Sequence, residues 1–293
     1  MSYFKILGFD KEPFSTSPDP NFFYLSREHE TALTNILIEL RLKRGLSVIL
    51  GDVGTGKTTL SRKLIQELKD REDFVFQIIL DPSFENELFF LSAIARNFEI
   101  EDLANTETGI FPSIMHARES LERFLFQKGV TENKIVVLII DESQKLNEGS
   151  LEVLRGLLNY ETNEFKLLQL VLLGQMELHS KIITISNFFD RISFKYTLNP
   201  LGLSETKEMI EFRIRQAGYK ANMNLFLDEA INSIYQCSKG YPRRIMMICH
   251  KALKALVMGK KFVVDAGLVD EIINEEMKSG WQRRDPLLQK NSC

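Results

Sequence analysis

Leu46-Ser-Val-Ile-Leu50 runs directly into Gly51-Asp-Val-Gly-Thr-Gly-Lys-Thr-Thr59, and this stretch decides the fold of the chain. Its first part is an apolar run with the length of a buried strand, and its second part matches the pattern G-x-x-x-x-G-K-[ST]. Glycine lets the backbone turn successive amide N–H groups inward, where they can bind phosphate oxygens. The stretch therefore predicts a strand, a phosphate-binding loop and a helix that follows the loop.

Each residue type in this loop suits the binding of a nucleotide. Lys57 would place a positive charge on the outer phosphates, in binding and in catalysis, and Thr58 would offer a hydroxyl to Mg²⁺. The helix that begins here adds the positive end of its dipole. We therefore expect ATP and Mg²⁺ as ligands. The expected nucleotide-binding residues of the loop are Gly51, Asp52, Val53, Gly54, Thr55, Gly56, Lys57, Thr58 and Thr59.

A second apolar run, Lys134-Ile-Val-Val-Leu-Ile-Ile-Asp-Glu142, ends in two adjacent carboxylates. The carboxyl ends of parallel strands share one edge of a sheet, so we expect Asp141 beside the phosphate loop. There it would hold the Mg²⁺ that Thr58 also contacts. Glu142 is the expected general base, which polarises a water for attack on the γ-phosphate. The alternative is a pair of acids that merely ends a strand, and the loop upstream favours the functional interpretation.

The pattern of the chain predicts an α/β fold. Short β-type runs at 46–50, 74–80, 135–140, 167–173 and 194–198 are separated by longer helical stretches. Apolar strands that alternate with helices imply a parallel sheet covered on both faces. After Pro200 the strands stop, and helical patterns follow at 204–217 and near 227–238, 242–258 and 267–278.

Four segments are therefore expected. Residues 1–30 form an arm rich in phenylalanine and proline and the start of the first helix, which Ser26 can cap. Residues 31–200 form the nucleotide-binding α/β domain, residues 201–278 a small helical lid, and residues 279–293 a tail.

Composition narrows the class of protein. The 293 residues are 44% hydrophobic and 26% charged, with a formal net charge of −3. The apolar runs are far shorter than the roughly 18–20 residues that cross a bilayer, so no transmembrane segment is expected. The N-terminus lacks the features of a secretory signal, which favours a cytoplasmic location. Three widely spaced cysteines indicate neither a disulfide framework nor a zinc site.

The net charge argues against a protein whose whole surface binds nucleic acid. DNA binding stays open through a local basic patch, for which 41–44 and 282–284 are the candidates. Short charge runs are more often solvated surfaces.

Other polar residues are expected to act on the phosphates. An arginine from a neighbouring subunit can stabilise the transition state of phosphoryl transfer, and Arg191 is the candidate, with Arg155 as its rival. Gln175 follows the fourth strand and either orients the attacking water or bonds the backbone of a turn. Arg243, more than Arg244, would reach the γ-phosphate from the start of a lid helix.

With these residues in place, the chain resembles the AAA+ ATPases of the general secretion pathway A (ExeA-like) group. The resemblance extends from about Tyr3 to about residue 275. It rests on several motifs in the same order: Phe9-x-x-x-Pro13-Phe14, Phe23-Tyr-Leu-Ser26, the phosphate loop, Ile139-Ile-Asp-Glu-Ser-Gln144, Leu158-Asn-Tyr-Glu161, the run 167–175 and Gly240-Tyr-Pro-Arg-Arg-Ile245.

The resemblance implies a P-loop NTPase core with strand order 5-1-4-3-2, a helical lid, and ATP hydrolysis linked to oligomerisation in a ring or filament. Relatives serve the assembly of secretion or pilus machinery at the inner membrane, which implies a protein partner there and a peripheral location. The alternative is an ATP-dependent, DNA-binding regulator of transposition target choice, the role of related ATPases in mobile elements.

The sequence departs from the family at a few positions. Ser143 stands where the family often has alanine, and Met176 where it often has proline. Secretion relatives often continue into a transmembrane segment and a cell-wall-binding region, whereas this chain stops at Cys293. A direct role in opening the cell wall is therefore not expected.

Overall fold

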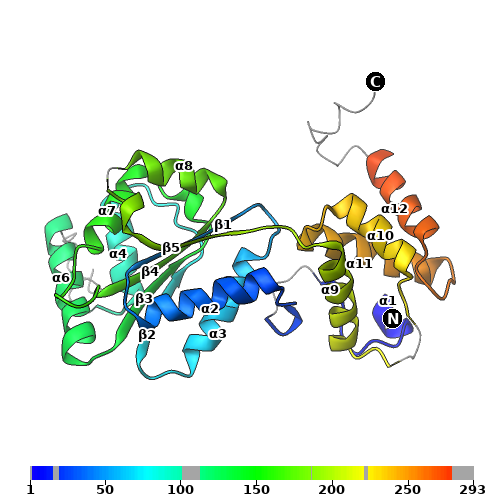
Figure 1. Cartoon of the computed structure of the whole chain (residues 1–293), viewed down its shortest axis with the longest axis horizontal. Coiled ribbons are helices and arrows are strands. Elements are labelled where there is room, and N and C mark those ends of the chain that lie inside the picture. The colour runs from blue at the N-terminus through cyan, green and yellow to red at the C-terminus, as the bar shows by residue number, and fades with distance from the viewer. Residues whose placement is uncertain (1, 16–19, 101–112, 186, 221–223, 279–293) are drawn as a thin grey trace. The chain divides into compact units, whose positions relative to one another are not determined.

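A computed structural model describes residues 2–15, 20–100, 113–185, 187–220 and 224–278 of the chain. It divides the chain into two compact units, which Figure 1 shows in colours that follow the residue number. The first, here called the α/β unit, consists of Arg27–Asn199. The second, the helical unit, consists of Met1–Ser26 together with Pro200–Cys293. The N-terminal arm, expected as a segment of its own, thus packs with the C-terminal helices.

The α/β unit is built on a five-stranded sheet in which every neighbouring pair is parallel. Its strand order, β2-β3-β4-β1-β5, is the expected order 5-1-4-3-2 counted from the other edge. The expected fold class is therefore confirmed, and strand ends differ by only one or two residues. The strands are β1 (Leu46–Gly51), β2 (Phe74–Ile79), β3 (Ile135–Ile140), β4 (Leu168–Gly174) and β5 (Ile192–Leu198).

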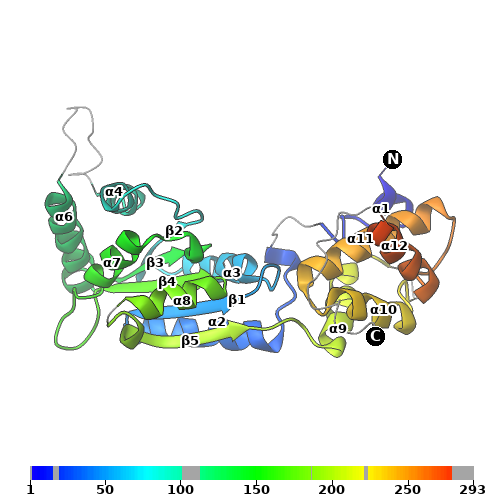
Figure 2. The same cartoon turned by 90° about the horizontal axis from the view of Figure 1, so that it is seen from above.

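Burial along the strands follows their places in the sheet. Every residue of β1, β3 and β4 is buried, because helices cover both faces of these central strands. Along the edge strand β5, half-buried and exposed residues alternate up to the last residue, Leu198, which is buried. Figure 1 shows α2 and α3 on one side of the sheet and α7 and α8 on the other. Figure 2 shows α4 and α6 side by side, in agreement with their contacts.

Several helices of the α/β unit begin directly after a residue that caps them. Asn86, Ser113 and Asn147 each accept a hydrogen bond from a main-chain N–H of the helix that they precede, as good N-caps do. The helices are α2 (Arg27–Arg41), α3 (Lys57–Lys69), α4 (Glu87–Asn97), α6 (Ile114–Phe126), α7 (Glu148–Leu157) and α8 (Met176–Thr184), with the short turns η3 (Gln127–Thr131), η4 (Ser143–Lys145) and η5 (Phe189–Arg191).

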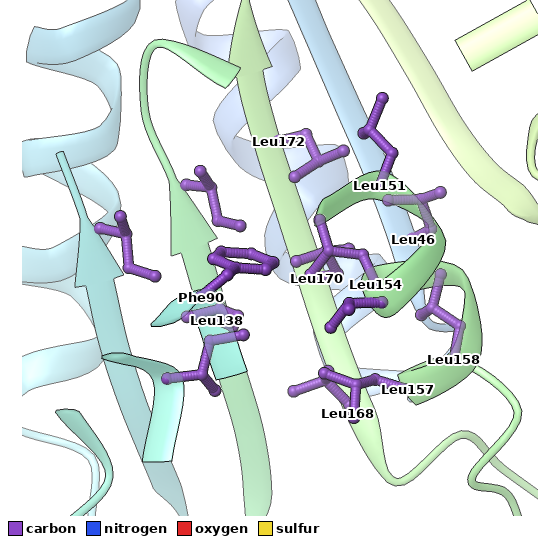
Figure 3. Packing of buried hydrophobic residues seen from close by; sticks show 14 of the residues in the cluster. Leu46, Phe90, Leu138, Leu151, Leu154, Leu157, Leu158, Leu168, Leu170 and Leu172 are labelled. Atoms are coloured by element: carbon purple, nitrogen blue, oxygen red, sulfur yellow. The ribbon is translucent and has the colours of Figure 1, made fainter. Parts of the chain in front are cut away.

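One continuous hydrophobic cluster fills the space between the sheet and the helices on one of its faces. Alternate residues of the central strands, such as Leu138 and Leu170, pack against Phe90 of α4 and Leu154 of α7 (Figure 3). These four side chains have no exposed surface. The period of two along each strand puts the remaining residues on the opposite face, under α2 and α3.

The helical unit contains the four C-terminal helices that the periodicity predicts. They are α9 (Leu203–Gln216), α10 (Asp228–Ser238), α11 (Pro242–Met258) and α12 (Ala266–Lys278), joined by the short α1 (Tyr3–Ile6) and η1 (Pro20–Phe22) of the arm. Phe9 and Phe14 of the arm are 1% exposed and belong to the same hydrophobic cluster as Cys249. Burial raises the pKa of the Cys249 thiol. Across the described residues, we find no helix with the length and apolar character needed to span a membrane.

Arg213 of α9 ties the arm to the C-terminal helices. Its guanidinium donates three hydrogen bonds to main-chain carbonyls of the arm, at 2.8 Å to Pro13, 2.7 Å to Phe22 and 3.0 Å to Ser15. It also lies over the ring of Phe22. The fork of guanidinium donors suits such a set of acceptors, and Arg213 is only 6% exposed.

We expect Arg213→Ala to destabilise the helical unit by about 3 kcal/mol, because it leaves buried carbonyls without donors at a typical cost of about 1–3 kcal/mol each. Thermal unfolding would measure the loss, and limited proteolysis would report release of the arm. Arg215→Ala is the matched control, since the Arg215 side chain is 70% exposed and pairs with Glu211 only at 3.8 Å. Equal stability of the two variants would refute the role of Arg213.

Candidate phosphate and metal site

The loop between β1 and α3 requires glycine at specific places. Gly54 and Gly56 have φ angles of +88° and +102°, in a region that side chains strongly disfavour. A Cβ on Gly56 would lie 2.8 Å from Nε2 of His29, and one on Gly51 would lie 2.7 Å from Oγ1 of Thr55. The loop thus follows a path that only glycine permits, with β1 before it and α3 after it, as a phosphate-binding loop does.

The buried side chain of His29 bonds to the backbone of the loop. It is 2% exposed on α2, and its Nε2 lies 2.9 Å from the main-chain oxygen of Thr55. Because a carbonyl oxygen only accepts hydrogen bonds, Nε2 carries the proton. The sequence patterns do not predict a role for this residue. Nothing in its local sequence marks it, and only the packing of α2 against α3 brings it to the loop.

Lys57, the first residue of α3, is 6% exposed although it carries a charge. Its ammonium donates hydrogen bonds to the main-chain oxygens of Gly51 at 2.6 Å and Asp52 at 2.9 Å. Burial lowers the pKa of Lys57, and the nearby carboxylates of Glu142 and Asp141 partly oppose this effect. The ammonium is therefore held inside the loop next to the two acids that follow β3.

Asp141 meets Thr58 directly. The carboxylate of Asp141, 1% exposed, accepts hydrogen bonds from the Thr58 hydroxyl and, at 2.9 Å, from the main-chain N–H of Glu142. Burial raises the pKa of Asp141, and these two hydrogen bonds act in the opposite direction. The two side chains that the sequence assigns to one Mg²⁺ are thus in contact. A single carboxylate and a hydroxyl suit Mg²⁺, which takes few protein ligands and completes its shell with phosphate and water.

Among the described residues there is no group of three or more His, Cys, Asp or Glu side chains that could hold a metal ion.

Glu142 has an unusual backbone. Its φ of +51° and ψ of 34° lie in the left-handed region, which costs a non-glycine residue about 1–2 kcal/mol. Its side chain is held by the amide of Gln144, whose Nε2 donates to Oε2 of Glu142 at 2.7 Å. Local strain of this kind is concentrated at functional sites, where the surrounding structure maintains it.

Gln144 also reaches the end of β4. Its Oε1 accepts a hydrogen bond at 3.1 Å from the main-chain N–H of Gln175, the residue that precedes α8. The sequence predicts a role for the side chain of Gln175, whereas this contact uses its backbone. Gln144 belongs to the motif Ile139-Ile-Asp-Glu-Ser-Gln144, but the motif does not predict that its side chain joins two strand ends.

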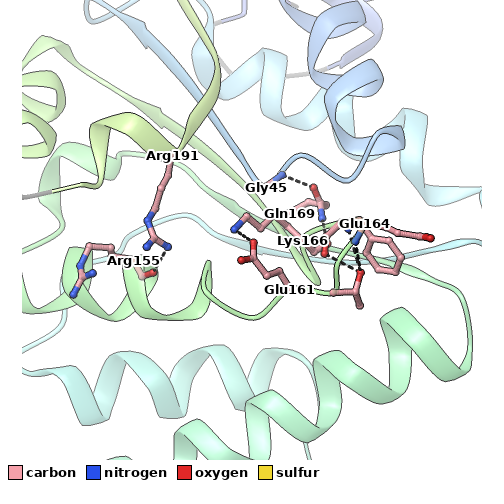
Figure 4. Close-up of polar contacts among 9 residues, drawn as sticks. Gly45, Arg155, Glu161, Glu164, Lys166, Gln169 and Arg191 are labelled. Carbon is pink, nitrogen blue, oxygen red and sulfur yellow. Dashed lines mark hydrogen bonds and ion pairs between the residues drawn. The ribbon is translucent and has the colours of Figure 1, made fainter.

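The two arginines expected to compete for one role lie next to each other (Figure 4). Nη1 of Arg191 donates to the main-chain oxygen of Arg155 at 3.2 Å, and Nε of Arg155 pairs with Glu152 at 2.7 Å. Arg191 ends η5 directly before β5, whose first residue pairs with Leu46 at the start of β1. Arg191 therefore lies at the edge where the strands begin.

The phosphate loop follows the opposite end of β1. A six-residue strand at about 3.3 Å per residue is about 20 Å long, so β1 separates Arg191 from the loop of the same chain by roughly that distance. Arg243 belongs to the helical unit, where it is exposed in the first turn of α11 after Pro242. Its expected contact with phosphate would join the two units and stays a prediction.

Comparison with known proteins identifies relatives by sequence. Residues 40–182 match a family model described as an AAA domain. General secretion pathway protein A of Aeromonas hydrophila is 34% identical over 255 residues, which cover 86% of this chain and 44% of that protein. A potential ATP-binding protein of Staphylococcus aureus is 28% identical over 112 residues, or 38% of this chain and 40% of that protein. The chain thus spans less than half the length of these relatives.

Solved structures resemble the fold. The Aeropyrum pernix ORC2 protein matches 91% of this chain and 72% of its own, with a TM-score of 0.63 and 19% identity. The Thermotoga maritima RuvB Holliday junction branch migration motor matches 84% of this chain and 68% of its own, with a TM-score of 0.54 and 17% identity. At these identities the likeness concerns the fold alone.

We expect Gly56→Ala to lower stability by about 1–3 kcal/mol, because alanine is strained at this φ and its Cβ meets His29. We also expect ATP with Mg²⁺ to raise the melting temperature of the wild type and to have no such effect on Gly56→Ala. Both are measured by thermal unfolding. Gly156→Ala in α7, where a Cβ meets nothing within 4 Å, should instead be neutral or stabilising by about 0.5–1 kcal/mol. Unchanged ATP stabilisation in Gly56→Ala would contradict the loop assignment.

Proposed function

Since the chain belongs to the AAA+ ATPases of the general secretion pathway A (ExeA-like) group, we propose that it binds ATP with Mg²⁺ and hydrolyses it. The contact between the Thr58 hydroxyl and the Asp141 carboxylate carries this proposal. It brings the loop after β1 and the acidic end of β3 to one point, although 83 positions separate the two residues along the chain (141 − 58). Phosphoryl transfer depends on such an arrangement of positive charge and metal ligands around the phosphates.

The chain's own groups divide the work of binding. Main-chain N–H groups of the loop would surround the phosphates, and the Lys57 ammonium would turn from the carbonyls of Gly51 and Asp52 to the outer phosphates. Thr58 and Asp141 would hold Mg²⁺, which supplies positive charge to the phosphate oxygens as the transferred group departs. Arg243 is proposed to add a contact with the γ-phosphate from the lid helix α11.

Glu142 is the proposed general base. Its carboxylate lies close enough to Lys57 to raise the pKa of the ammonium. This proximity supports a position for Glu142 near the outer phosphates. The carboxylate would accept a hydrogen bond from the attacking water and take up its proton, a function typically worth a factor of about 10²–10⁴ in rate. Gln175 is proposed to help orient the same water.

A neighbouring subunit is proposed to complete the site. The roughly 20 Å length of β1 supports a role for Arg191 in a second copy rather than in its own chain. Arg155 is the alternative candidate for the same role. The two arginines are joined by a hydrogen bond and so lie at the same place on the sheet. An active form would then be a homo-oligomer, in a ring or a filament, in which each arginine reaches the phosphates of the next subunit.

The proposed biological role is the assembly of a secretion or pilus-type envelope machine. Support comes from 34% identity with general secretion pathway protein A over 86% of this chain. The nucleotide cycle would control oligomerisation, and a protein partner at the inner membrane would recruit a cytoplasmic ATPase to its periphery.

We expect Lys57→Ala to lower affinity for ATP by about 100-fold, because a hydrogen bond to a charged group is worth up to about 3 kcal/mol. Glu142→Gln should keep ATP affinity and lose about 10²–10⁴ in turnover. Calorimetry measures the affinity and phosphate release the turnover. Lys63→Ala on the same helix is the control, since Lys63 pairs only with Glu67 at the surface. Full turnover in Glu142→Gln would overturn the assignment of the base.

One observation favours the second candidate, a DNA-binding regulator. Every exposed residue of α11 is arginine, lysine or methionine, and no acidic residue stands between Glu229 and Asp265. The exposed residues are Arg243, Arg244, Met247, Lys251, Lys254 and Met258. A basic helix face is typical of proteins that bind nucleic acid phosphates.

Of the basic stretches expected from the sequence, 41–44 belongs to the α/β unit and not to α11. In 41–44, Arg41 pairs with Asp73 and Lys43 bonds to Asn133 and lies over Phe165, all within the α/β unit. The other stretch, 282–284, lies outside the described residues. The DNA candidate therefore rests on α11 and the lysines that follow it.

If DNA binds this face, Lys254→Glu with Lys260→Glu should weaken ATP-dependent binding to duplex DNA by about tenfold or more and reduce its salt dependence. Fluorescence anisotropy at several salt concentrations measures both. Lys69→Glu, an exposed position at the end of α3, controls for the change in net charge. Absence of wild-type binding at low salt would remove this candidate.

A further inference from the structure

The side chain of Gln144 joins the ends of two strands. On one side its Nε2 donates to Oε2 of Glu142 at 2.7 Å. On the other side its Oε1 accepts from the main-chain N–H of Gln175 at 3.1 Å. Glu142 follows β3 and Gln175 follows β4, which are neighbours in the sheet. One amide therefore links the proposed base to the next strand end.

Both partners select the same orientation of this amide. A main-chain N–H can only donate, so the oxygen of the amide must face Gln175. An ionised carboxylate can only accept, so the NH₂ group must face Glu142. Rotating the amide by half a turn would lose both hydrogen bonds at once, which means that Gln144 presents a donor to the carboxylate as its stable arrangement.

The backbone around Gln144 is held from three directions. Lys181 of α8 donates to the main-chain oxygens of Gln144 at 2.5 Å and Leu146 at 2.9 Å. The buried hydroxyl of Ser143 donates to the oxygen of Ile140 at 2.8 Å. Beneath the turn, a Cβ on Gly174 would lie 3.3 Å from the nitrogen of Gln144. The turn η4 is thus fixed to α8, to β3 and to β4. The side-chain amide of Gln144 is therefore held in place next to Glu142.

We propose that Gln144 is the positioning residue for Glu142 and couples its carboxylate to the β4–α8 junction. This inference rests on the proposed ATPase function. Glu142 is a flexible side chain on a strained backbone, and its polarising effect on water depends on where its oxygens lie. The hydrogen bond from Gln144 occupies Oε2 and leaves Oε1 to accept from the water. A shift at the start of α8 would pass to Glu142 through this amide.

A variant of Gln144 can distinguish a positioning role from simple stabilisation of the turn. Gln144→Met keeps the length and volume of the side chain but removes both hydrogen bonds. We expect a 10–100-fold lower kcat with KM for ATP changed by less than about threefold, because Gln144 makes no hydrogen bond to the phosphate loop. Lys145→Ala in the same turn, with an exposed side chain that pairs with Asp81, should keep wild-type kcat.

Gln144→Glu tests the same contact by charge. It replaces the NH₂ group that donates to Glu142 with a carboxylate, so the hydrogen bond to Oε2 is lost while the length of the side chain is kept. We expect kcat to fall at least as far as in Gln144→Met, with KM for ATP again changed by less than about threefold. Turnover is measured by phosphate release on the full chain, with thermal unfolding to confirm that each variant is folded.

The outcomes distinguish the two proposals. Absence of wild-type turnover would overturn the ATPase function and, with it, the role of Gln144. Wild-type turnover with an unchanged kcat in Gln144→Met or in Gln144→Glu would overturn the positioning role alone. Loss of ATP affinity in Gln144→Met would also overturn it, because the residue would then serve binding.

Discussion

The contact between the Asp141 carboxylate and the Thr58 hydroxyl is the interaction on which the site depends, and parallel strand pairing makes it possible. Since β1, β3 and β4 run in one direction, their carboxyl ends meet at one edge of the sheet. The loop after β1 and the acids after β3 stand on either side of β4. An antiparallel neighbour would have carried one of these groups to the far edge, where no shared metal ion could join them.

This arrangement by itself lowers the stability of the folded state. It buries the charges of Lys57 and Asp141, and it holds Glu142 in a left-handed conformation. Charged groups leave water only when hydrogen bonds and opposite charges compensate. Here main-chain carbonyls bind the ammonium, and a hydroxyl and an N–H bind the carboxylate. The fully buried strands supply the stability that allows such a site, because their apolar residues pack on both faces of the sheet.

The two ends of the parallel strands have different proposed roles. Next to the carboxyl ends lie the groups that would bind the phosphates and activate the attacking water. The edge where strands begin holds Arg191 next to Arg155, about one strand length away. If Arg191 acts on the phosphates of a second copy, as proposed, the geometry of one sheet would couple turnover to assembly. Gln144 adds a connection at the carboxyl ends, from the proposed base to the start of α8.

The sequence by itself determined the class of fold, the strand order through its resemblance, and the candidate loop and acids. These features are written in local runs: an apolar strand, a glycine pattern and a strand ending in Asp141-Glu142. Only the tertiary structure decided the contacts of His29 with the loop, of Gln144 with Gln175, and of Arg213 with the arm. Such contacts join residues 26, 31 and about 200 positions apart, and no local period encodes them. They arise because packed helices and neighbouring strand ends bring distant donors and acceptors within about 3 Å of each other.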